Sequence, residues 1–545
     1  MKKFTASLFA SLMLVLCACV AVQAAPPLAS ASRTVEQDRA LIEKLQHDTF
    51  LYMWEYSFPS GMVRESSREY PDGPAAVGGT GFGVAALVVA VERGWVSRED
   101  ALKRLLTLTD FLANRTDRKK LHGAFPHWID GNTGATRIFG SDDIGADLVE
   151  TAFLMEGLLI ARAYFDGDGD EATLRQRITE IWEDIDWNWF TNGENNGLYW
   201  HWSAETGFTK GMKITGFNEA MIAYVLALSS PTHPIAPEAL KAWYSPEEYQ
   251  NRHYYGLDIE GAIIYTGPLF IIHYSFIGLD PRELADSHVT KGYWPRNVTQ
   301  ALINRAYCLY LAHWSTKFHD GFWGLTSSET PTGYLYSSPV YESATVAPTA
   351  ALASMPYVPE YAMRVLWDIR THHPSLWSLH GPRDAYSQRD DWASPFYIAI
   401  DQLPIVCMVE NYRSGLLWKL FMGIPEIQKG LKRGGFSTPP LTTGFPRMVV
   451  PCKPGIGKSW VPDACDLRRH PDTGHYAVSY AREQGGPVTF TLQKEDGTLL
   501  FQENLNVDAG HHELTLPDSL TPGSDILTLT MKAGHETHTL PIRLN

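Results

Sequence analysis

The sequence predicts a mainly α-helical domain followed by a smaller β-rich domain, on three observations. From about Thr34 to Phe436, apolar residues recur with the i, i+3, i+4, i+7 spacing of amphipathic helices. Strands and helices do not alternate there, which excludes Rossmann and TIM-barrel folds. After Phe436 the chain becomes rich in proline, and from His475 onward apolar residues alternate as they do in strands. We therefore expect a helical domain, a connector and a β-sandwich.

The helical part is expected to close into a toroid of helical hairpins. Ser97 before Arg98-Glu99-Asp100 is typical of a helix start, because a serine caps the helix and acidic residues suit its dipole. So many helices either stack as a solenoid or close into a toroid. A solenoid would show a fixed repeat of roughly 34 to 40 residues, and the sequence has none, so the toroid is favoured. The expected helices are 34–57, 81–94, 98–116, 142–164, 171–186, 216–229, 266–278, 297–314, 359–371 and 404–422.

The residues after the helical part divide into a connector and a small accessory domain. Residues 437–474 are rich in proline, so an extended connector is expected. Residues 475–545 contain short runs with a period of two, and Asp496-Gly497 lies between two of them, a pair typical of a hairpin turn. This pattern predicts a β-sandwich with an accessory role.

The N-terminus predicts export from the cytoplasm. Lys2 and Lys3 precede an apolar run, and Val22-Gln23-Ala24 matches the small-x-small pattern of a signal-peptide cleavage site, so residues 1–24 are expected to be removed. The alternative is a lipoprotein signal, in which Leu16–Cys19 is a lipobox and Cys19 carries a lipid anchor. No later apolar stretch reaches about 18 residues, so no transmembrane helix is expected. Both alternatives give a periplasmic or extracellular protein.

Charge and cysteine content restrict the partners. The formal net charge of −15 repels nucleic acid and anionic lipid, so neither is an expected partner. Cys452 and Cys465 lie in the proline-rich stretch, where an exported protein can form a disulfide. Cys308 and Cys407 lie in apolar helical patterns and are expected to be buried thiols. There is no CxxC motif or Cys/His cluster, so no metal site is expected.

The segment Ser141–Ala152 contains three carboxylates and no lysine or arginine. On a helix, Asp143, Asp147 and Glu150 would share one stripe, where like charges repel. Two interpretations remain open. The segment is either an exposed acidic helix start, favoured by the helix dipole, or a functional cluster of carboxylates.

Glu219 and Asp401 are two further candidates. Glu219 begins a strongly apolar segment without a nearby basic residue, and a carboxyl group in apolar surroundings has the raised pKa that a general acid needs. The alternative for Glu219 is a helix-start residue that satisfies backbone amides. Asp401 lies just before the helix that carries Glu410 and Arg413, and these two are expected to form a structural ion pair.

Several aromatic side chains lie between the predicted helices rather than within them. Aromatic faces suit pyranose rings, whose C–H faces stack while their hydroxyls bond to carboxylates and amides. A single tryptophan in a loop usually packs, but clusters of them near unpaired carboxylates favour a sugar-binding cleft. The clusters are His127-Trp128, Trp187–Phe190, Tyr199-Trp200-His201-Trp202 and Phe322-Trp323.

With these motifs, the chain resembles the bacterial glycoamylase-like proteins, and more specifically glycoside hydrolase family 144, the β-1,2-glucanases. The resemblance runs from about Phe50 to Phe436 and excludes the connector and the sandwich. The motifs that carry it are Gly79–Gly83, Ser141–Phe153, Gly216-Phe217-Asn218-Glu219-Ala220, Gly267–Phe270, His273-Tyr274-Ser275, Trp323–Thr326, Ala347–Ala351 and Glu410–Arg413.

The resemblance implies an (α/α)6 toroid with a cleft at one end, no cofactor, and hydrolysis with inversion. Inverting enzymes protonate the leaving oxygen with one carboxylic acid and activate water with a carboxylate roughly 6.5–9.5 Å away. Carried over by position, Glu219 is the acid, and Asp143 and Asp401 are the other catalytic candidates. The expected substrate-binding residues are Asp147, Glu150, Trp128, Trp200, Trp202, His273, Tyr274 and Trp323.

Two departures from the family pattern concern the length of the products. Leu403-Pro404 stands where the family has Gly-Pro, and His380–Tyr386 replaces a Tyr-Gly-Phe-x-Asp-Ala-Phe motif. Both changes are expected at the rim of the cleft. They leave the preferred product length open, and the resemblance to the family favours an endo-acting β-1,2-glucanase. The alternatives are an exo-acting enzyme of the same fold, releasing sophorose or acting on α-glucan, and an inactive glycan-binding protein.

Overall fold

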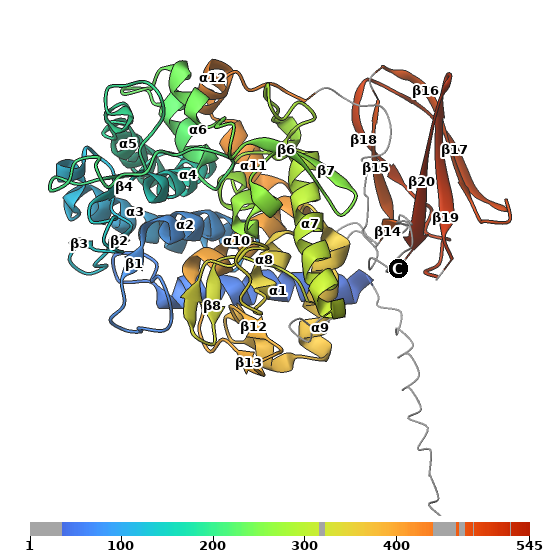
Figure 1. The fold of residues 1–545 in the computed structure, drawn as a ribbon, viewed down its shortest axis with the longest axis horizontal. Helices are drawn as coiled ribbons and strands as arrows, with labels where there is room; N and C mark the ends of the chain where they lie inside the picture. Colours follow the sequence, from blue (N-terminus) through green and yellow to red (C-terminus); the bar gives the residue numbers. More distant parts are fainter. Residues whose placement is uncertain are drawn as a thin grey trace, which may run out of the picture.

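The computed structural model describes residues 35–314, 322–439, 465–467, 475–482, 484–523 and 525–544. Helices dominate up to residue 433, and the longer strands follow in a separate region at the C-terminal end of the chain (Figure 1). The leader, Cys19 and Cys452 lie outside the described residues. The predicted disulfide therefore stays a prediction. Within the described ranges, no helix combines the length and the apolarity that crossing a bilayer requires.

The predicted helical region is confirmed as helix-rich. Ser97 caps α3 as expected, because its side chain accepts a hydrogen bond from the backbone N–H of Asp100. Cys308 and Cys407 are buried free thiols, as predicted. The helices are α1 (Val35–Tyr56), α2 (Val77–Glu92), α3 (Arg98–Asn114), α4 (Leu148–Tyr164), α5 (Asp170–Glu183), α6 (Met221–Ser229), α7 (Tyr293–Trp314), α8 (Pro348–Ala353), α9 (Pro359–Thr371), α10 (Ala399–Arg413), α11 (Leu416–Met422) and α12 (Pro425–Arg433).

Three helix predictions were wrong in detail, and a fourth, 404–422, is divided between α10 and α11 at Ser414 and Gly415. The segment 266–278 forms short 3-10 turns rather than one helix, including Leu269–Ile272 and Tyr274–Phe276. The helices predicted to begin at residues 142 and 216 begin later, at Leu148 and Met221. Tertiary contacts override local propensity in all three segments, since each contributes to the site described below.

Helices α2 and α4 form the centre of the helical region. They pack so closely that a Cβ atom on Gly157 would lie 1.9 Å from the carbonyl oxygen of Gly81. Both helices are apolar on every side, and α2 is buried from Val77 to Ala90, which is typical of a helix surrounded by others. Helix α10 packs against both α1 and α2.

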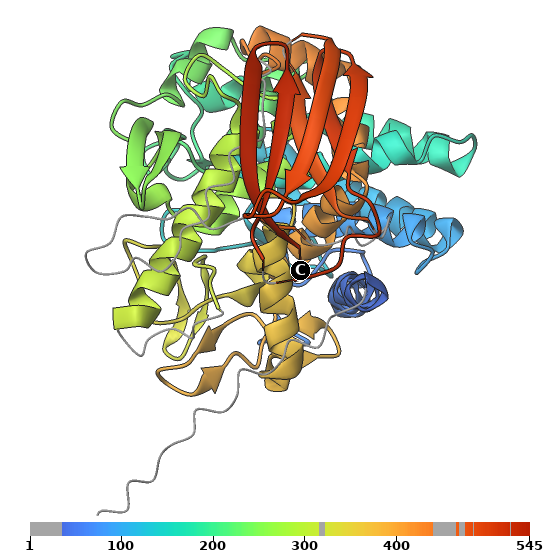
Figure 2. The ribbon, with the colours of Figure 1, turned by 90° about the vertical axis from the view of Figure 1, so that its right-hand side faces the viewer.

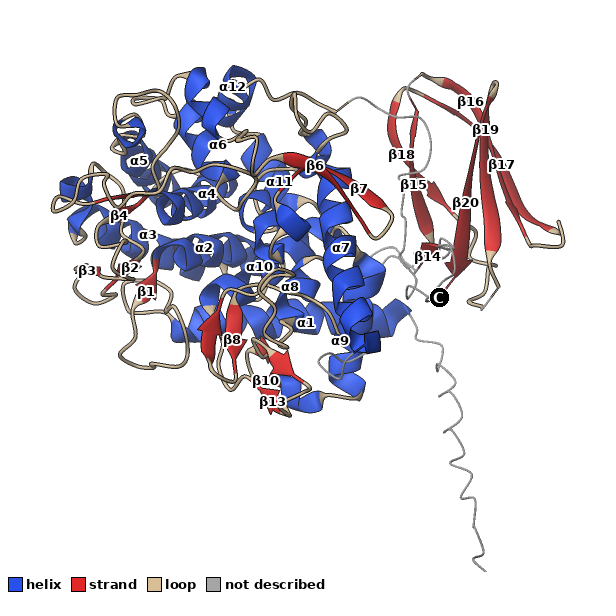
Figure 3. Ribbon diagram, in the orientation of Figure 1, coloured by secondary structure: helices blue, strands red, loops and turns tan. Residues whose placement is uncertain are grey.

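Short strands fasten the loops between the helices (Figure 3). Strands β1, β2 and β3 form one sheet, and strands β4 to β13 form two-stranded antiparallel sheets. Their bounds are β1 (Ala75–Ala76), β2 (Trp128–Ile129), β3 (Thr136–Arg137), β4 (Ala146–Asp147) with β5 (His201–Trp202), β6 (Gln250–Tyr254) with β7 (Leu257–Ala262), β8 (Ser328–Thr330) with β9 (Gly333–Leu335), β10 (Trp377–Ser378) with β11 (Gly381–Pro382), and β12 (Tyr386–Ser387) with β13 (Trp392–Ala393).

The C-terminal region consists of a five-stranded and a two-stranded sheet that share a core (Figure 2). The five-stranded sheet has the order β14 (Cys465–Leu467), β20 (Glu536–Leu544), β19 (Leu527–Ala533), β16 (Gly486–Gln493) and β17 (Leu499–Val507). Strands β15 (Ala477–Arg482) and β18 (Gly510–Thr515) form the other sheet. The Asp496-Gly497 turn between β16 and β17 confirms the predicted hairpin, with Gly497 at a φ of 84°.

Candidate functional site

The N-terminal ends of α2, α4 and α10 are tied together by backbone hydrogen bonds. The N–H of Val77, which begins α2, donates to the carbonyl of His127 at 3.2 Å. The N–H of Asp147, just before α4, donates to Phe125 at 2.8 Å, and that of Ala399, which begins α10, donates to Glu65 at 2.8 Å. Because helix N-termini carry partial positive charge, they favour the carboxylates that gather there.

One group of carboxylates surrounds His127. The Nδ1 atom of His127 lies 3.0 Å from the Oδ2 atom of Asp143 and 3.0 Å from the Oδ2 atom of Asp147. The Nε2 atom of His201, on β5, lies 3.8 Å and 3.7 Å from the same two oxygens. Asp143 and Asp147 precede α4 instead of sharing a helical stripe with Glu150, so that interpretation was wrong. The imidazole, rather than helical spacing, brings the two carboxylates together.

Asp147 and Glu150 are held by backbone N–H groups. The Oδ1 atom of Asp147 caps α4, accepting hydrogen bonds from Val149 and Glu150 at 2.9 Å each. The Oε2 atom of Glu150 accepts one from the N–H of Gly78 on α2 at 2.7 Å. Glycine is required there, because a Cβ atom on Gly78 would lie 2.6 Å from that oxygen. The close packing of α2 and α4 thus places Glu150 beside the His127 group.

The charges of this group are strongly coupled. Burial by itself lowers the pKa of an imidazole, but Glu150, Asp143 and Asp147 outweigh it and raise the pKa of His127 well above its usual value. Burial raises the pKa of Glu150 to about 8, although His127 opposes the rise. Burial also favours a raised pKa for Asp147, but the hydrogen bond to His127 prevails and lowers it. Near neutral pH the group therefore holds an imidazolium, an ionised Asp147 and a protonated Glu150.

His127, Asp143 and Asp147 are also the residues in the described ranges whose ligand atoms converge as a metal ion would need. One nitrogen or oxygen from each lies within 4.8 Å of the other two. The imidazole ring is held in place by stacking on Phe139, with ring centres 3.8 Å apart. The group is nearly enclosed, since His127 is 20% exposed and Asp143 is 5% exposed.

Glu219 lies in a turn two residues before α6, not inside the helix as predicted. Its backbone carbonyl accepts a hydrogen bond from the hydroxyl of Ser275, which also accepts one from the N–H of Ile222 at 3.0 Å. Burial raises the pKa of Glu219 to about 7, and the charge of Asp147 adds to the rise. Glu219 therefore exchanges a proton near neutral pH, as a general acid must.

Asp401 lies in the first turn of α10 and belongs to a second group of carboxyls. Its neighbour Asp384 is fully buried, and the Oδ2 atom of Asp384 accepts a hydrogen bond from the N–H of Glu329 at 2.7 Å. Burial and the hydrogen-bonded Asp384 raise the pKa of Asp401 well above its usual value, and burial raises that of Asp384 to about 7. Glu329 forms an ion pair with Arg68. The Asp384–Asp401 pair therefore retains a proton near neutral pH.

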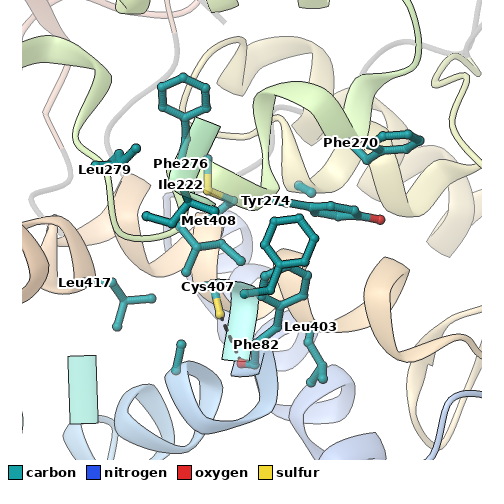
Figure 4. Close-up of a cluster of buried hydrophobic side chains, with 14 of the residues drawn as sticks. Phe82, Ile222, Phe270, Tyr274, Phe276, Leu279, Leu403, Cys407, Met408 and Leu417 are labelled. Atoms are coloured by element: carbon teal, nitrogen blue, oxygen red, sulfur yellow. Dashed lines mark hydrogen bonds between the residues drawn. The ribbon is translucent and has the colours of Figure 1, made fainter. Parts of the chain in front are cut away.

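Tyr274 is a buried tyrosine whose pKa is affected by carboxyls of both groups and by Glu219. Its hydroxyl is buried and has no hydrogen-bond partner among the described residues. Burial raises the pKa of Tyr274 well above its usual value, and the charges of Asp401, Glu219 and Glu150 act in the same direction. Its ring packs on Phe82 and Phe270, with centres 5.0 Å and 5.2 Å away (Figure 4). A rigid aromatic core thus presents one hydroxyl to the carboxyls of three segments.

The predicted aromatic residues fall into two sets. Trp128, Trp200 and Trp202 are partly exposed and lie near the His127 group, since Trp128 follows His127 and Trp202 pairs with Ala146 across β4 and β5. Trp128 also lines a hollow of about 440 Å³. His273 and Trp323, by contrast, are 2% and 1% exposed.

The substrate-binding role predicted for His273 and Trp323 is therefore corrected, because side chains this deeply buried cannot meet a sugar. The Nε2 atom of His273 hydrogen-bonds with Ser354 at 2.9 Å, and burial lowers the pKa of His273 to about 3. Glu410 is structural, as predicted, but its ion pair at 2.8 Å is with Arg93.

The prediction from sequence missed several residues that the structure brings to the site. His127 was noted only for its neighbouring tryptophan, and Asp384 lies inside the His380–Tyr386 motif that was assigned to the rim. Glu65 had no signal at all, yet its charge acts on both Glu150 and Asp401. Such residues are joined only by contacts between segments far apart in the chain.

Comparisons with known proteins point to one family. The Glycoamylase family model matches residues 211–425. The structure of the endo-β-1,2-glucanase from Chitinophaga pinensis is 40% identical, with 74% of this chain and 99% of that chain covered and a TM-score of 0.70. The structure of a β-1,2-glucanase from Parabacteroides distasonis is 38% identical, with 73% of this chain and 60% of that chain covered and a TM-score of 0.70.

A curated relative from Parabacteroides distasonis is an exo β-1,2-glucooligosaccharide sophorohydrolase that acts at the non-reducing end. It is 38% identical over 422 residues, which make up 73% of this chain. The match spans only 58% of that relative's own length.

Proposed function

The chain belongs to the glycoamylase-like family, whose similar members are β-1,2-glucan hydrolases of glycoside hydrolase family 144, and from this membership we propose that it hydrolyses β-1,2-glucan with inversion. The fold that goes with this proposal is an (α/α)6 toroid over residues 25–436, a connector over 437–474 and a β-sandwich over 475–545. The helix-rich region and the two C-terminal sheets described above are consistent with it, except that β14 lies within the proposed connector and pairs with β20 in the five-stranded sheet.

The arrangement around Tyr274 carries the proposal. Hydrolysis of a glycoside needs a protonated carboxyl beside the leaving oxygen and an ionised carboxylate to activate water. Here three segments bring Glu219, Asp401 and Glu150 within electrostatic reach of one buried hydroxyl. Glu219 is assigned as the acid, because burial raises its pKa to about 7, so that a large fraction of the enzyme still carries this proton in neutral solution.

The water-activating carboxylate is assigned to Asp401, acting within its pair with Asp384. Two buried carboxyls that hold one proton between them keep one negative charge, and the pair as a unit can therefore accept a proton from water, as in other carboxylate dyads. Asp143 is the second candidate, because its Oδ1 atom has no hydrogen-bond partner within the described ranges, while its Oδ2 atom lies 3.0 Å from His127.

Azide distinguishes the two candidates. A small anion can take the place of an absent general base. Azide should therefore restore turnover to Asp401→Ala, and not to Asp143→Ala, if Asp401 is the base. Rescue of Asp143→Ala alone would move the role to Asp143. The Asp142→Asn variant, which changes an exposed neighbour of Asp143, is the control and should need no rescue.

Endo cleavage is proposed over exo cleavage because the chain covers 99% of the Chitinophaga pinensis endo-β-1,2-glucanase. The exo-acting relative is covered over only 58% of its length, so features of its own unmatched part have no counterpart in this alignment. Trp128, Trp200 and Trp202 are proposed to bind glucosyl units by stacking, with Glu150 bonding to their hydroxyls. Asp147 is 1% exposed, so the substrate-binding role predicted for it is corrected on the same ground as those of His273 and Trp323.

The test is thin-layer chromatography of products from linear β-1,2-glucan, with soluble starch and laminarin in parallel. A ladder of short sophoro-oligosaccharides supports endo cleavage, and a single early disaccharide would make the enzyme exo-acting. Glucose from starch alone would replace the β-1,2 assignment with an α-glucan activity. Binding of β-1,2-glucan without cleavage would indicate an inactive glycan-binding protein.

The acid assignment has its own test. Glu219→Gln should bind glucan but abolish turnover, and full turnover in this variant would show that another group is the acid. Proton NMR of the first products should show the α-anomer, since inversion of a β-linkage gives that configuration. A β-anomer would rule out inversion.

Export is proposed from residues 1–24, which lie outside the described residues. We propose cleavage after Ala24 and release to the periplasm or the medium. Mass spectrometry of the N-terminal peptide from the native host should find Ala25 as the first residue. A diacylglyceryl group on Cys19 would instead establish the lipoprotein alternative.

A further inference from the structure

The spacing of polar atoms around His127 is close to that of a tetrahedral metal site. Zinc ligands lie about 2.0–2.2 Å from the ion, which places them roughly 3.3–3.5 Å from one another. The Nδ1 atom of His127 lies 3.0 Å from the Oδ2 atoms of both Asp143 and Asp147. The ligand atoms of all three residues lie within 4.8 Å of one another, so small shifts of the side chains would seat an ion among them.

Asp143 supplies independent support, because it is a buried carboxylate whose hydrogen-bonding capacity is only partly used. It is 5% exposed, and its Oδ1 atom has no hydrogen-bond partner within the described part of the chain. Its Oδ2 atom shares the Nδ1 atom of His127 with Asp147. A buried and incompletely satisfied carboxylate is costly, and a cation bound to its Oδ2 atom would offset that cost.

The two other ligands are already held in position. Two backbone N–H groups bind the Oδ1 atom of Asp147, so its Oδ2 atom faces His127. Phe139 stacks on the imidazole of His127. Contacts of this kind around metal ligands fix their orientation and increase affinity. The Nε2 atom of His201 lies 3.8 Å and 3.7 Å from the two aspartate oxygens, where it borders the remaining coordination position.

The donor set selects the kind of cation. One imidazole and two carboxylates suit zinc and neighbouring transition metals, whereas magnesium and calcium require six or more oxygen ligands. Glu150 is a third carboxyl at the border of the site, with its Oε1 atom 4.0 Å from the Nε2 atom of His127.

We propose that His127, Asp143 and Asp147 bind a divalent cation of the zinc class, and that the bound ion inhibits the enzyme by excluding glucan from the same carboxylates. The binding site stands on the geometry alone, and only its inhibitory effect rests on the proposed function. It was missed in the sequence because these ligands do not have the spacing of a known metal motif.

Isothermal titration calorimetry of the full chain, after treatment with EDTA and dialysis, tests the binding. We expect ZnCl2 to bind one site per chain, and MgCl2 at the same concentration to release no heat. His127→Ala and Asp143→Asn should each weaken zinc binding at least tenfold. His253→Ala and Asp142→Asn change exposed residues of the same types and should bind zinc as the unaltered chain does.

Absence of zinc binding, or equal binding by the unaltered chain and Asp143→Asn, would overturn the proposal. Circular dichroism of each variant shows whether it is folded, and His127→Gln replaces His127→Ala if the alanine variant unfolds. Binding by Asp143→Asn but not by His127→Gln would place the ion on another set of ligands and also overturns it.

Kinetics test the inhibition. Zinc should raise the KM for β-1,2-glucan and EDTA should restore it. A sophoro-oligosaccharide should in turn weaken zinc binding, because coupling between two ligands is reciprocal. Restored activity on adding zinc to EDTA-treated enzyme would overturn the inhibitory role. A chain that binds zinc but cleaves no β-1,2-glucan would instead refute the proposed function and leave the metal site standing.

Discussion

The side chain of Ser275 is hydrogen-bonded to the backbone carbonyl of Glu219, although the two residues belong to different segments of the chain. The same hydroxyl accepts a hydrogen bond from the N–H of Ile222 in the first turn of α6. Because Ser275 is fully buried, one hydroxyl holds the turn of Glu219 against the helix that follows it.

Ser275→Ala should lower kcat while leaving KM nearly unchanged. Loss of both hydrogen bonds frees the Glu219 turn, and a displacement of about 1 Å can reduce a rate up to about 100-fold. Steady-state kinetics on β-1,2-glucan give both constants.

The control is Ser354→Ala, which removes another fully buried hydroxyl, bonded to His273 rather than to the Glu219 segment. Its thermal stability should fall comparably, because a buried partner is again left unsatisfied, but its kcat should not. Equal losses of kcat in the two variants would mean that Ser275 acts through stability alone.

Activity should decline above about pH 7. A general acid works only while protonated, and burial raises the pKa of Glu219 to about 7, so the enzyme loses its active form as the pH rises through that value. The measurement is kcat/KM against pH for the free enzyme. An alkaline limb above pH 9 would contradict the assignment of Glu219 as the acid.

Asp384 should make the protein less stable as the pH rises. An aspartate in the unfolded chain has a pKa of about 3.9, whereas burial raises the pKa of Asp384 in the folded protein to about 7. The contribution of Asp384 to the free energy of unfolding is therefore fully present below about pH 4 and is lost as the pH rises toward 7. Asp384→Asn cannot ionise, and its Tm should therefore fall less than that of the unaltered chain between pH 5 and pH 8.

Differential scanning calorimetry measures both Tm profiles. Asp110→Asn, a change at an exposed aspartate on α3, should leave the profile as it is. Parallel profiles for Asp384→Asn and the unaltered chain would show that Asp384 ionises normally in the folded protein.

Gly157→Ala should destabilise the helical region. The added Cβ atom would lie 1.9 Å from the carbonyl oxygen of Gly81, so α2 and α4 must separate, at a cost of about 3 kcal/mol for overpacking of this kind. Because Glu150 and Gly78 bridge the same two helices, activity should fall as well.

The matched control for that change is Gly140→Ala, since a Cβ atom at Gly140 meets nothing within 4 Å. Thermal melting of the two variants is compared. A Tm for Gly157→Ala within one degree of the control would mean that α2 and α4 are not packed so closely in solution.

The sequence contained enough information to identify most of the helical region and part of the site. Buried helices α2 and α4 were recognisable from their apolar residues, and Asp147, Glu150 and Glu219 from carboxyls without nearby basic residues. His273 and Trp323 were misjudged, because residues of a shared motif can equally pack in the core.

What the sequence by itself determined is local: the helical and strand periods, the Ser97 cap, the Asp496-Gly497 turn and the absence of basic residues around Glu219. Each of these depends on residues within a few positions of one another. Only the tertiary structure decided that His127 faces Asp143 and Asp147, and that Asp384 pairs with Asp401. Burial and the pKa of a group depend on what distant segments place around it, and no local spacing records that.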